Sequence, residues 1–181
     1  MGARNRIDPA WAVNWRAQDE RWSLRCDSML NFDRPELNTI RDIWRARASE
    51  QSVPARGDLD ARTLKPFLRH ISIVERVPDG ARRWRYRKRL SATATTEIVG
   101  ETMGRFLDEF ALPGVLSQWI CVLDVVLCAK VPLRTFGPSL DPALPHLSLE
   151  CFVAPLKDAQ GEATLVLVCT YVESRLRSDT L

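Results

Sequence analysis

Histidine and glycine are scarce in this chain, and no two cysteines are closely spaced. Only two histidines, His70 and His146, occur among 181 residues, which argues against histidine-based catalysis and against most zinc sites. Eight glycines and eleven prolines exclude a collagen-like or low-complexity chain. No CxxC pair is present, so zinc ribbons and thioredoxin chemistry have no support. We expect the five cysteines to be mostly buried, reduced thiols in a reducing compartment.

A large excess of one charge and a long apolar run are also missing. Lysine and arginine number 26 against 23 acidic residues, a net charge of +3, whereas a nucleic-acid-binding domain usually carries a larger excess. The most apolar segment, 112–131, is interrupted by Gln118, Asp124 and Lys130, and a membrane span needs about 20 mainly apolar residues. The N-terminus has no apolar signal-peptide region. We therefore expect a cytoplasmic protein with neither a membrane nor a nucleic acid as partner.

The length suits one domain with an extension. Residues 1–32 are expected to form an N-terminal extension, in which Trp11, Trp15 and Trp22 are spaced to share a helix face. The domain itself is expected over 33–173, as a helical lead-in (33–68) and a core (69–173), with a tail at 174–181. A helix beginning after Asp33 is expected to run to about Glu50.

Alternating apolar residues in the core predict five strands, and a periodic apolar stripe predicts one long helix from Pro113 to Lys130. The turn signal Pro78-Asp79-Gly80 joins the first two strands into a hairpin. These elements predict an α+β fold, in which helices cover one face of a five-stranded antiparallel sheet. The strands are expected at 71–77, 82–91, 131–136, 146–155 and 163–172.

Five short motifs follow one another along the chain: Trp44, Pro54-Ala55-Arg56-Gly57-Asp58-Leu59-Asp60, Leu68-Arg69-His70-Ile71, Arg85-Tyr86-Arg87 and Gly100-Glu101-Thr102-Met103-Gly104-Arg105-Phe106-Leu107-Asp108-Glu109. These motifs and the order of the elements resemble the PAS domain family, in particular its short stand-alone bacterial members of the alphaproteobacterial type. The resemblance covers about residues 37–172, and the usual L-x-G-T after the second strand lacks its glycine, since the run here is Leu90-Ser91-Ala92-Thr93.

The resemblance implies a sensory or protein-interaction domain, often a homodimer, with a cavity between sheet and helices and no particular ligand. We expect no catalytic residues, no metal site and no effector domain in this chain, so a signal would pass through a partner protein or through a rearranged dimer. The tryptophans at 11, 15, 22 and 44 are the expected interface, because large aromatic side chains anchor interfaces.

Eight apolar positions on inward faces are candidates for the walls of such a cavity, although the same stripe also fits a filled core. Haem is disfavoured because the helix 113–130 lacks histidine, and a light-reactive flavin is disfavoured because Gly104 stands where the adduct-forming cysteine would precede Arg105-Phe106-Leu107. The cofactor is otherwise open. The candidates are Trp84, Tyr86, Phe106, Phe110, Trp119, Leu123, Phe152 and Val168.

Four arginines alternate along the second strand of the hairpin, at Arg83, Arg85, Arg87 and Arg89. Because alternate residues share one face of a strand, this arginine stripe is an alternative functional surface for a phosphate, a nucleic acid or a cyclic dinucleotide. The other interpretation is a face that is solvated or paired with acids, with Trp84 and Tyr86 pointing inward. 

Overall fold

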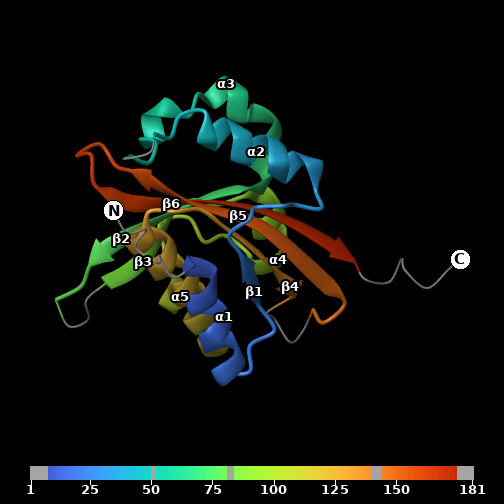
Figure 1. Cartoon of the computed structure of the whole chain (residues 1–181). Coiled ribbons are helices and arrows are strands. Elements are labelled where there is room, and N and C mark those ends of the chain that lie inside the picture. Colours follow the sequence, from blue (N-terminus) through green and yellow to red (C-terminus); the bar gives the residue numbers. More distant parts are fainter. Residues whose placement is uncertain (1–7, 50–51, 81–83, 140–143, 175–181) are drawn as a thin grey trace, which may run out of the picture.

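The computed structural model describes residues 8–49, 52–80, 84–139 and 144–174. One antiparallel sheet forms the middle layer, with the strand order β1-β4-β5-β6-β2-β3 (Figure 1). The α+β fold with an antiparallel sheet is therefore confirmed. The strands are β1 (Arg25–Asp27), β2 (Ile71–Pro78), β3 (Trp84–Leu90), β4 (Leu133–Pro138), β5 (Leu147–Lys157) and β6 (Ala163–Ser174).

The sheet has one more strand than the five that the alternation predicts. The additional strand, β1, comes from the N-terminal extension and pairs antiparallel with the edge strand β4. Three residues are too few to display an alternating pattern in the sequence. The extension is thus part of the folded body, because its strand completes the sheet and its helix covers it.

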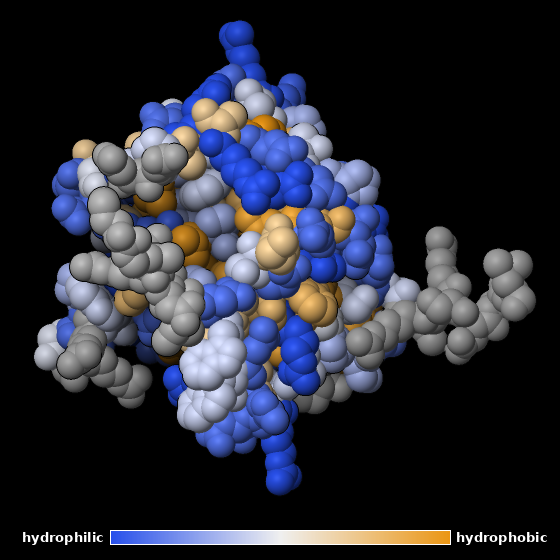
Figure 2. Space-filling model, viewed as in Figure 1, coloured by the Kyte–Doolittle hydropathy of each residue, from blue (hydrophilic) through white to orange (hydrophobic). Residues whose placement is uncertain are grey.

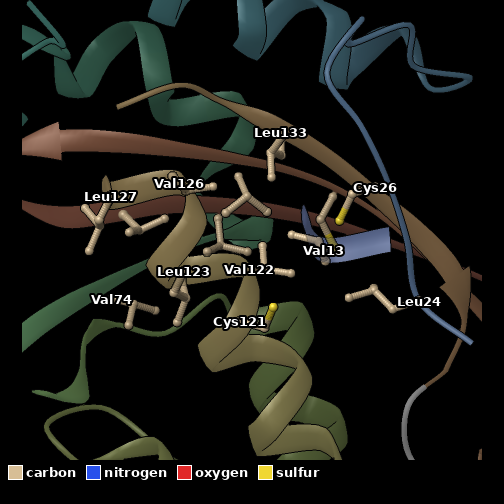
Figure 3. Close-up of a cluster of buried hydrophobic side chains, with 14 of the residues drawn as sticks. Val13, Leu24, Cys26, Val74, Cys121, Val122, Leu123, Val126, Leu127 and Leu133 are labelled. Carbon is tan, nitrogen blue, oxygen red and sulfur yellow. The ribbon is translucent and has the colours of Figure 1, made fainter. Parts of the chain in front are cut away.

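Two helices pack on one face of the sheet, α1 (Pro9–Asp19) and the long α5 (Pro113–Ala129). The apolar side chains of α5 point toward the strands, and α1 adds Val13 to the same cluster (Figure 3). Val74 of β2 and Leu133 of β4 meet them from the sheet. This layer corresponds to the single helical face that the sequence predicts.

The opposite face of the sheet is also covered, which the expected fold did not include (Figure 1). The covering elements are the lead-in helices: α2 (Pro35–Arg45), η1 (Arg56–Asp58), α3 (Ala61–Leu64) and η2 (Lys65–His70). Trp44 of α2 is buried there, and its indole N–H donates to the Pro155 carbonyl at 3.0 Å. The middle parts of β5 (151–156) and β6 (165–169) are apolar on both faces, so both faces need a cover to exclude water.

Between β3 and α5 the chain forms α4 (Thr93–Val99) and η3 (Leu107–Glu109). The backbone N–H of Gly104 donates to the Lys88 carbonyl at 2.7 Å, and the Lys88 N–H donates to the Arg105 carbonyl at 2.9 Å. Gly104 has φ +80°, a left-handed conformation that glycine adopts without strain. This segment covers the outer edge of β3.

The surface in the view of Figure 2 is mainly hydrophilic, with smaller hydrophobic areas between the polar side chains. Over the described parts of the chain, no helix is both long and apolar enough to span a bilayer. In those same parts, no three His, Cys, Asp or Glu side chains gather closely enough to hold a metal ion.

Candidate ligand cavity

A cavity of about 190 Å³ lies between the sheet and the helices α4 and α5. Its walls come from strands β2, β3, β5 and β6 on one side and from α4, η3 and α5 on the other. Most of its lining is apolar. The lining residues are Ser72, Val74, Lys88, Thr95, Leu107, Val115, Trp119, Leu123, Ser139, Leu144, Leu147, Leu149, Val168, Thr170 and Val172.

The register of the strands decides which residues reach this cavity. Ser72 of β2 pairs with Val168 of β6, and Val74 of β2 pairs with Lys88 of β3. Residues paired across neighbouring antiparallel strands point to the same face of a sheet. All four side chains therefore face α5 and contribute to one wall of the cavity.

Three of the eight candidate wall residues line the cavity: Trp119 and Leu123 from α5 and Val168 from β6. Tyr86 and Phe110 belong to the surrounding apolar cluster but are not part of the lining. The Tyr86 hydroxyl donates to the Asp124 carboxylate. Burial, together with this bond to a carboxylate, raises the pKa of Tyr86.

The other three candidates lie elsewhere, which corrects the expectation for them. Phe152 is fully buried on the opposite face of the sheet, where its ring meets Trp44 and Phe32 edge-on at centroid distances of 6.3 and 5.8 Å. Trp84 is the first residue of β3 and is 44% exposed, with the Arg76 guanidinium 4.5 Å from its ring centroid.

Phe106 lies beside the edge strand β3, where it forms an isolated β-bridge with Arg87, and it is half-buried. The guanidinium carbon of Arg85 lies 3.8 Å from its ring centroid, a cation–π geometry. Its ring therefore contacts the arginine face of β3 rather than the cavity.

Lys88 is the charged residue among the lining residues that the sequence interpretation missed. It is only 8% exposed and lies on the inward face of β3, beside Val74 of β2. The alternation of β3 could have revealed it, because Lys88 follows Tyr86 by two residues and so shares its face. The run of cations around it concealed this position.

The Lys88 ammonium forms no hydrogen bond, and no ion pair within 4.0 Å, with any residue that the structure describes. Burial lowers the pKa of Lys88, and the charge of Glu101 partly counteracts this effect. The Lys88 side chain is largely buried, but its ammonium nitrogen is not one of the fully buried polar atoms that lack a partner, so it reaches the accessible space of the cavity. An ammonium in such an apolar setting lacks most of its hydration. The cavity therefore presents one under-satisfied cation to any molecule that enters it.

The arginine stripe is largely paired with acidic side chains. Arg85 binds Asp108 at 3.0 Å, and this bond is the main cause that raises the pKa of Arg85. Arg87 binds Glu75 at 2.7 Å, and Arg89 approaches the same carboxylate at 3.8 Å. Arg83 lies outside the described residues.

A second hollow of about 290 Å³ lies on the α2 side of β4, β5 and β6. Its charged groups bind one another: Arg134 donates to Glu150 at 2.7 Å and to Asp33 at 2.8 Å, and Arg34 pairs with Glu173. Each of these arginines is thus paired with a carboxylate without a ligand, although the Nε of Arg34 has no hydrogen-bond partner, so this hollow is the weaker candidate site.

All five cysteines are free thiols, four of them buried, which confirms that part of the expectation; Cys128 is exposed. Burial raises the pKa of the Cys26 thiol to about 12. A thiol with this pKa stays protonated at neutral pH, and the thiolate is the form that attacks or binds a metal. The buried thiols therefore act as small apolar side chains.

The size of the cavity limits what it can hold. A cavity of about 150 Å³ accommodates benzene, so 190 Å³ suits a molecule of benzene size or somewhat larger. The three-ring system of a flavin has more than twice as many ring atoms as benzene, and a haem is larger still. In this conformation the residues present do not fit either group.

Comparisons with known proteins bear on the fold and the family. A family model described as a PAS domain matches residues 32–170. A solved structure titled "Structure of an RNA-binding Light-Oxygen-Voltage Receptor" is similar, with a TM-score of 0.38 and 14% identity. The similarity covers 69% of this chain and 37% of that one, so the chain spans little more than a third of that protein's length. No curated protein matches the chain.

Proposed function

Because the chain belongs to the PAS domain family, a family of sensory and signalling domains, we propose that it senses a small ligand held in the cavity between its sheet and α5. The signal leaves through protein contacts and not through catalysis. The observation that carries the proposal is the apolar cavity itself, whose walls join both strands of the hairpin to β5, β6, α4 and α5.

A ligand in this position touches elements that are far apart in the sequence. Thr95 of α4, Leu107 of η3 and Trp119 of α5 all line the cavity opposite the sheet. A ligand shifts a protein between two conformations only if it binds them unequally. A ligand that contacts three separate helical segments and the sheet can bind two conformations unequally, because a change in helix packing alters all of these contacts together.

The absence of catalysis is part of the proposal. A nucleophile of the Ser or Cys type needs a base within hydrogen-bond reach. His70 instead stacks on Tyr171 at a centroid distance of 4.0 Å, and its Nδ1 lies 3.1 Å from the Thr170 carbonyl. His146 is exposed. Neither histidine lines the cavity.

We also propose that the protein contacts involve a second copy of the chain through α1. Trp11 and Trp15 are 55% and 58% exposed, and their rings stack at 6.3 Å. Exposed, preordered aromatic side chains are typical anchors of interfaces. Trp22 and Trp44 are buried in the two apolar clusters instead, so the expectation that all four tryptophans form the interface is corrected.

The alternative, an anion bound by the arginine stripe, has less support. A phosphate at Arg85 and Arg87 would compete with carboxylates already 3.0 and 2.7 Å away. If the stripe bound nucleic acid, the affinity would fall steeply with salt and would depend on these arginines.

Native mass spectrometry of the purified chain, with an absorption spectrum from about 300 to 700 nm, tests the main proposal. We expect a retained small molecule in the wild type and in Thr93→Trp, which alters an exposed position of α4. Thr95→Trp fills the cavity from the same helix, and we expect it to lose that mass. If Thr95→Trp retains the molecule at the same stoichiometry, the cavity is not the ligand site. If the wild type and both variants carry no ligand, the result favours a protein-interaction module. The same spectra report the number of subunits.

A further inference from the structure

The cavity contains two polar side chains that are more than nine-tenths buried, Lys88 and Ser72. They lie on neighbouring strands, since Lys88 is paired with Val74 and Ser72 precedes Val74 by two residues on the same face. Both are donors toward the cavity. The Ser72 hydroxyl oxygen already accepts the Ala92 N–H at 3.1 Å, which leaves its proton to donate elsewhere.

The wall opposite these donors is mainly apolar, with Thr95 of α4 as a polar member. Trp119 and Leu123 of α5 and Leu149 of β5 are among the residues that form it. The site is thus amphipathic, with one cation and one hydroxyl at the β2–β3 side and hydrocarbon surface toward α5. A ligand that satisfies both parts needs an acceptor group at one end and an apolar body.

We propose that the cavity binds a small carboxylic acid, whose carboxylate pairs with Lys88 and Ser72 and whose hydrocarbon part contacts α5. This inference rests on the proposed function and names the chemical class of its ligand. Comparison with the benzene-sized cavity of about 150 Å³ suggests a ligand of roughly seven to ten heavy atoms.

The charge of the site selects a carboxylate over other groups. A neutral ligand would leave the Lys88 ammonium buried without a partner, at the cost of its desolvation. A phosphate monoester brings nearly two negative charges against one cation, and the excess charge would have to be buried. A carboxylate brings one charge and can accept hydrogen bonds from both donors.

Isothermal titration calorimetry with matched acids and amides tests this inference. The probes are octanoate against octanamide and phenylacetate against phenylacetamide, pairs that differ in charge but hardly in shape. We expect at least one acid to bind the wild type about ten- to a hundredfold more tightly than its amide, the range for a hydrogen bond to a charged group. Lys88→Met should abolish this difference.

Arg89→Met is the matched control, because it removes the same charge from the next residue on the opposite, exposed face of β3. It should keep the preference for the acid. Lys88→Gln is a second variant in case Lys88→Met fails to fold, and it too should lose the preference.

Each other outcome overturns the inference. If acids and amides bind the wild type equally, the ligand class is wrong while the proposed ligand-binding function stands. If the preference for the acid persists in Lys88→Met, the carboxylate is bound elsewhere. If no probe binds, a small carboxylic acid is not the ligand, and the mass retained in native mass spectrometry still decides the proposed function independently.

Discussion

Replacing Phe152 by alanine should strongly destabilise the fold without altering the ligand cavity. Phe152 lies in the cluster between β5 and α2, with no exposed surface, and Trp44 and Phe32 contact its ring edge-on. The substitution leaves a void that a packed layer on both sides of the ring cannot easily close. The cavity near α5 lies on the other face of the sheet, so its walls stay in place.

The size of the effect follows from burial and ring contacts. A fully buried Phe→Ala substitution costs about 3–5 kcal/mol in the free energy of unfolding. Each of the two edge-on contacts contributes roughly 0.5–1.5 kcal/mol beyond area burial, so we expect the upper part of that range. Domains are typically stable by about 5–15 kcal/mol, so the variant should fold, with a Tm lower by about 8–20 °C.

Urea denaturation followed by far-UV circular dichroism measures the free energy, and calorimetry with octanoate and octanamide measures the affinities on the folded variant. Leu123→Ala is the matched control, because Leu123 is equally buried but lines the cavity. It should be destabilising and should also change the probe affinities. A loss below about 1.5 kcal/mol for Phe152→Ala, outside the buried-Phe range, or a changed affinity, would refute this assignment of the two faces.

Three further predictions concern single groups. Burial lowers the pKa of Lys88 from its ordinary 10.5, so Lys88 binds its proton more tightly in the unfolded chain than in the folded one. Lys88→Met should therefore raise the free energy of unfolding at neutral pH, and this gain should shrink as the pH rises toward 10.5. A gain that does not change with pH contradicts the prediction. Trp44→Phe removes the donor to the Pro155 carbonyl and should cost about 1–3 kcal/mol in urea denaturation; an unchanged midpoint contradicts it. Iodoacetamide should label Cys128 alone in the native chain and all five thiols in denaturant, as counted by intact mass; rapid native labelling of a second thiol contradicts the burial.

The local elements were predictable because their signals are local. A periodic apolar stripe after Pro113 sets the length of α5, and the turn residues after Val77 separate β2 from β3. The family resemblance rests on motifs of the same short range. The helix expected to run to Glu50 ends at Arg45, since helix ends depend on packing and capping more than on propensity.

The candidate site was predictable only in part. Trp119 and Leu123 lie on the inward stripe of α5, so the helical period places them at the cavity. Arg85, Arg87 and Arg89 lie on one face of β3 as the alternation predicts, and Glu75 is the cross-strand neighbour of Arg87 in the hairpin. Asp108, the partner of Arg85, comes from η3, beyond the hairpin. Which acid meets which arginine depends on how the chain folds back.

By itself the sequence determined the types of the longer elements, the antiparallel α+β class and the burial of most cysteines, because these follow from spacing along the chain. Only the tertiary structure decided which side of the sheet each apolar residue faces. The middle parts of β5 (151–156) and β6 (165–169) are buried on both faces, so no polar residue marks one side there. Phe152 pairs with Cys169 and Val153 with Val168, and this register separates Phe152 from the cavity that Val168 and Lys88 line.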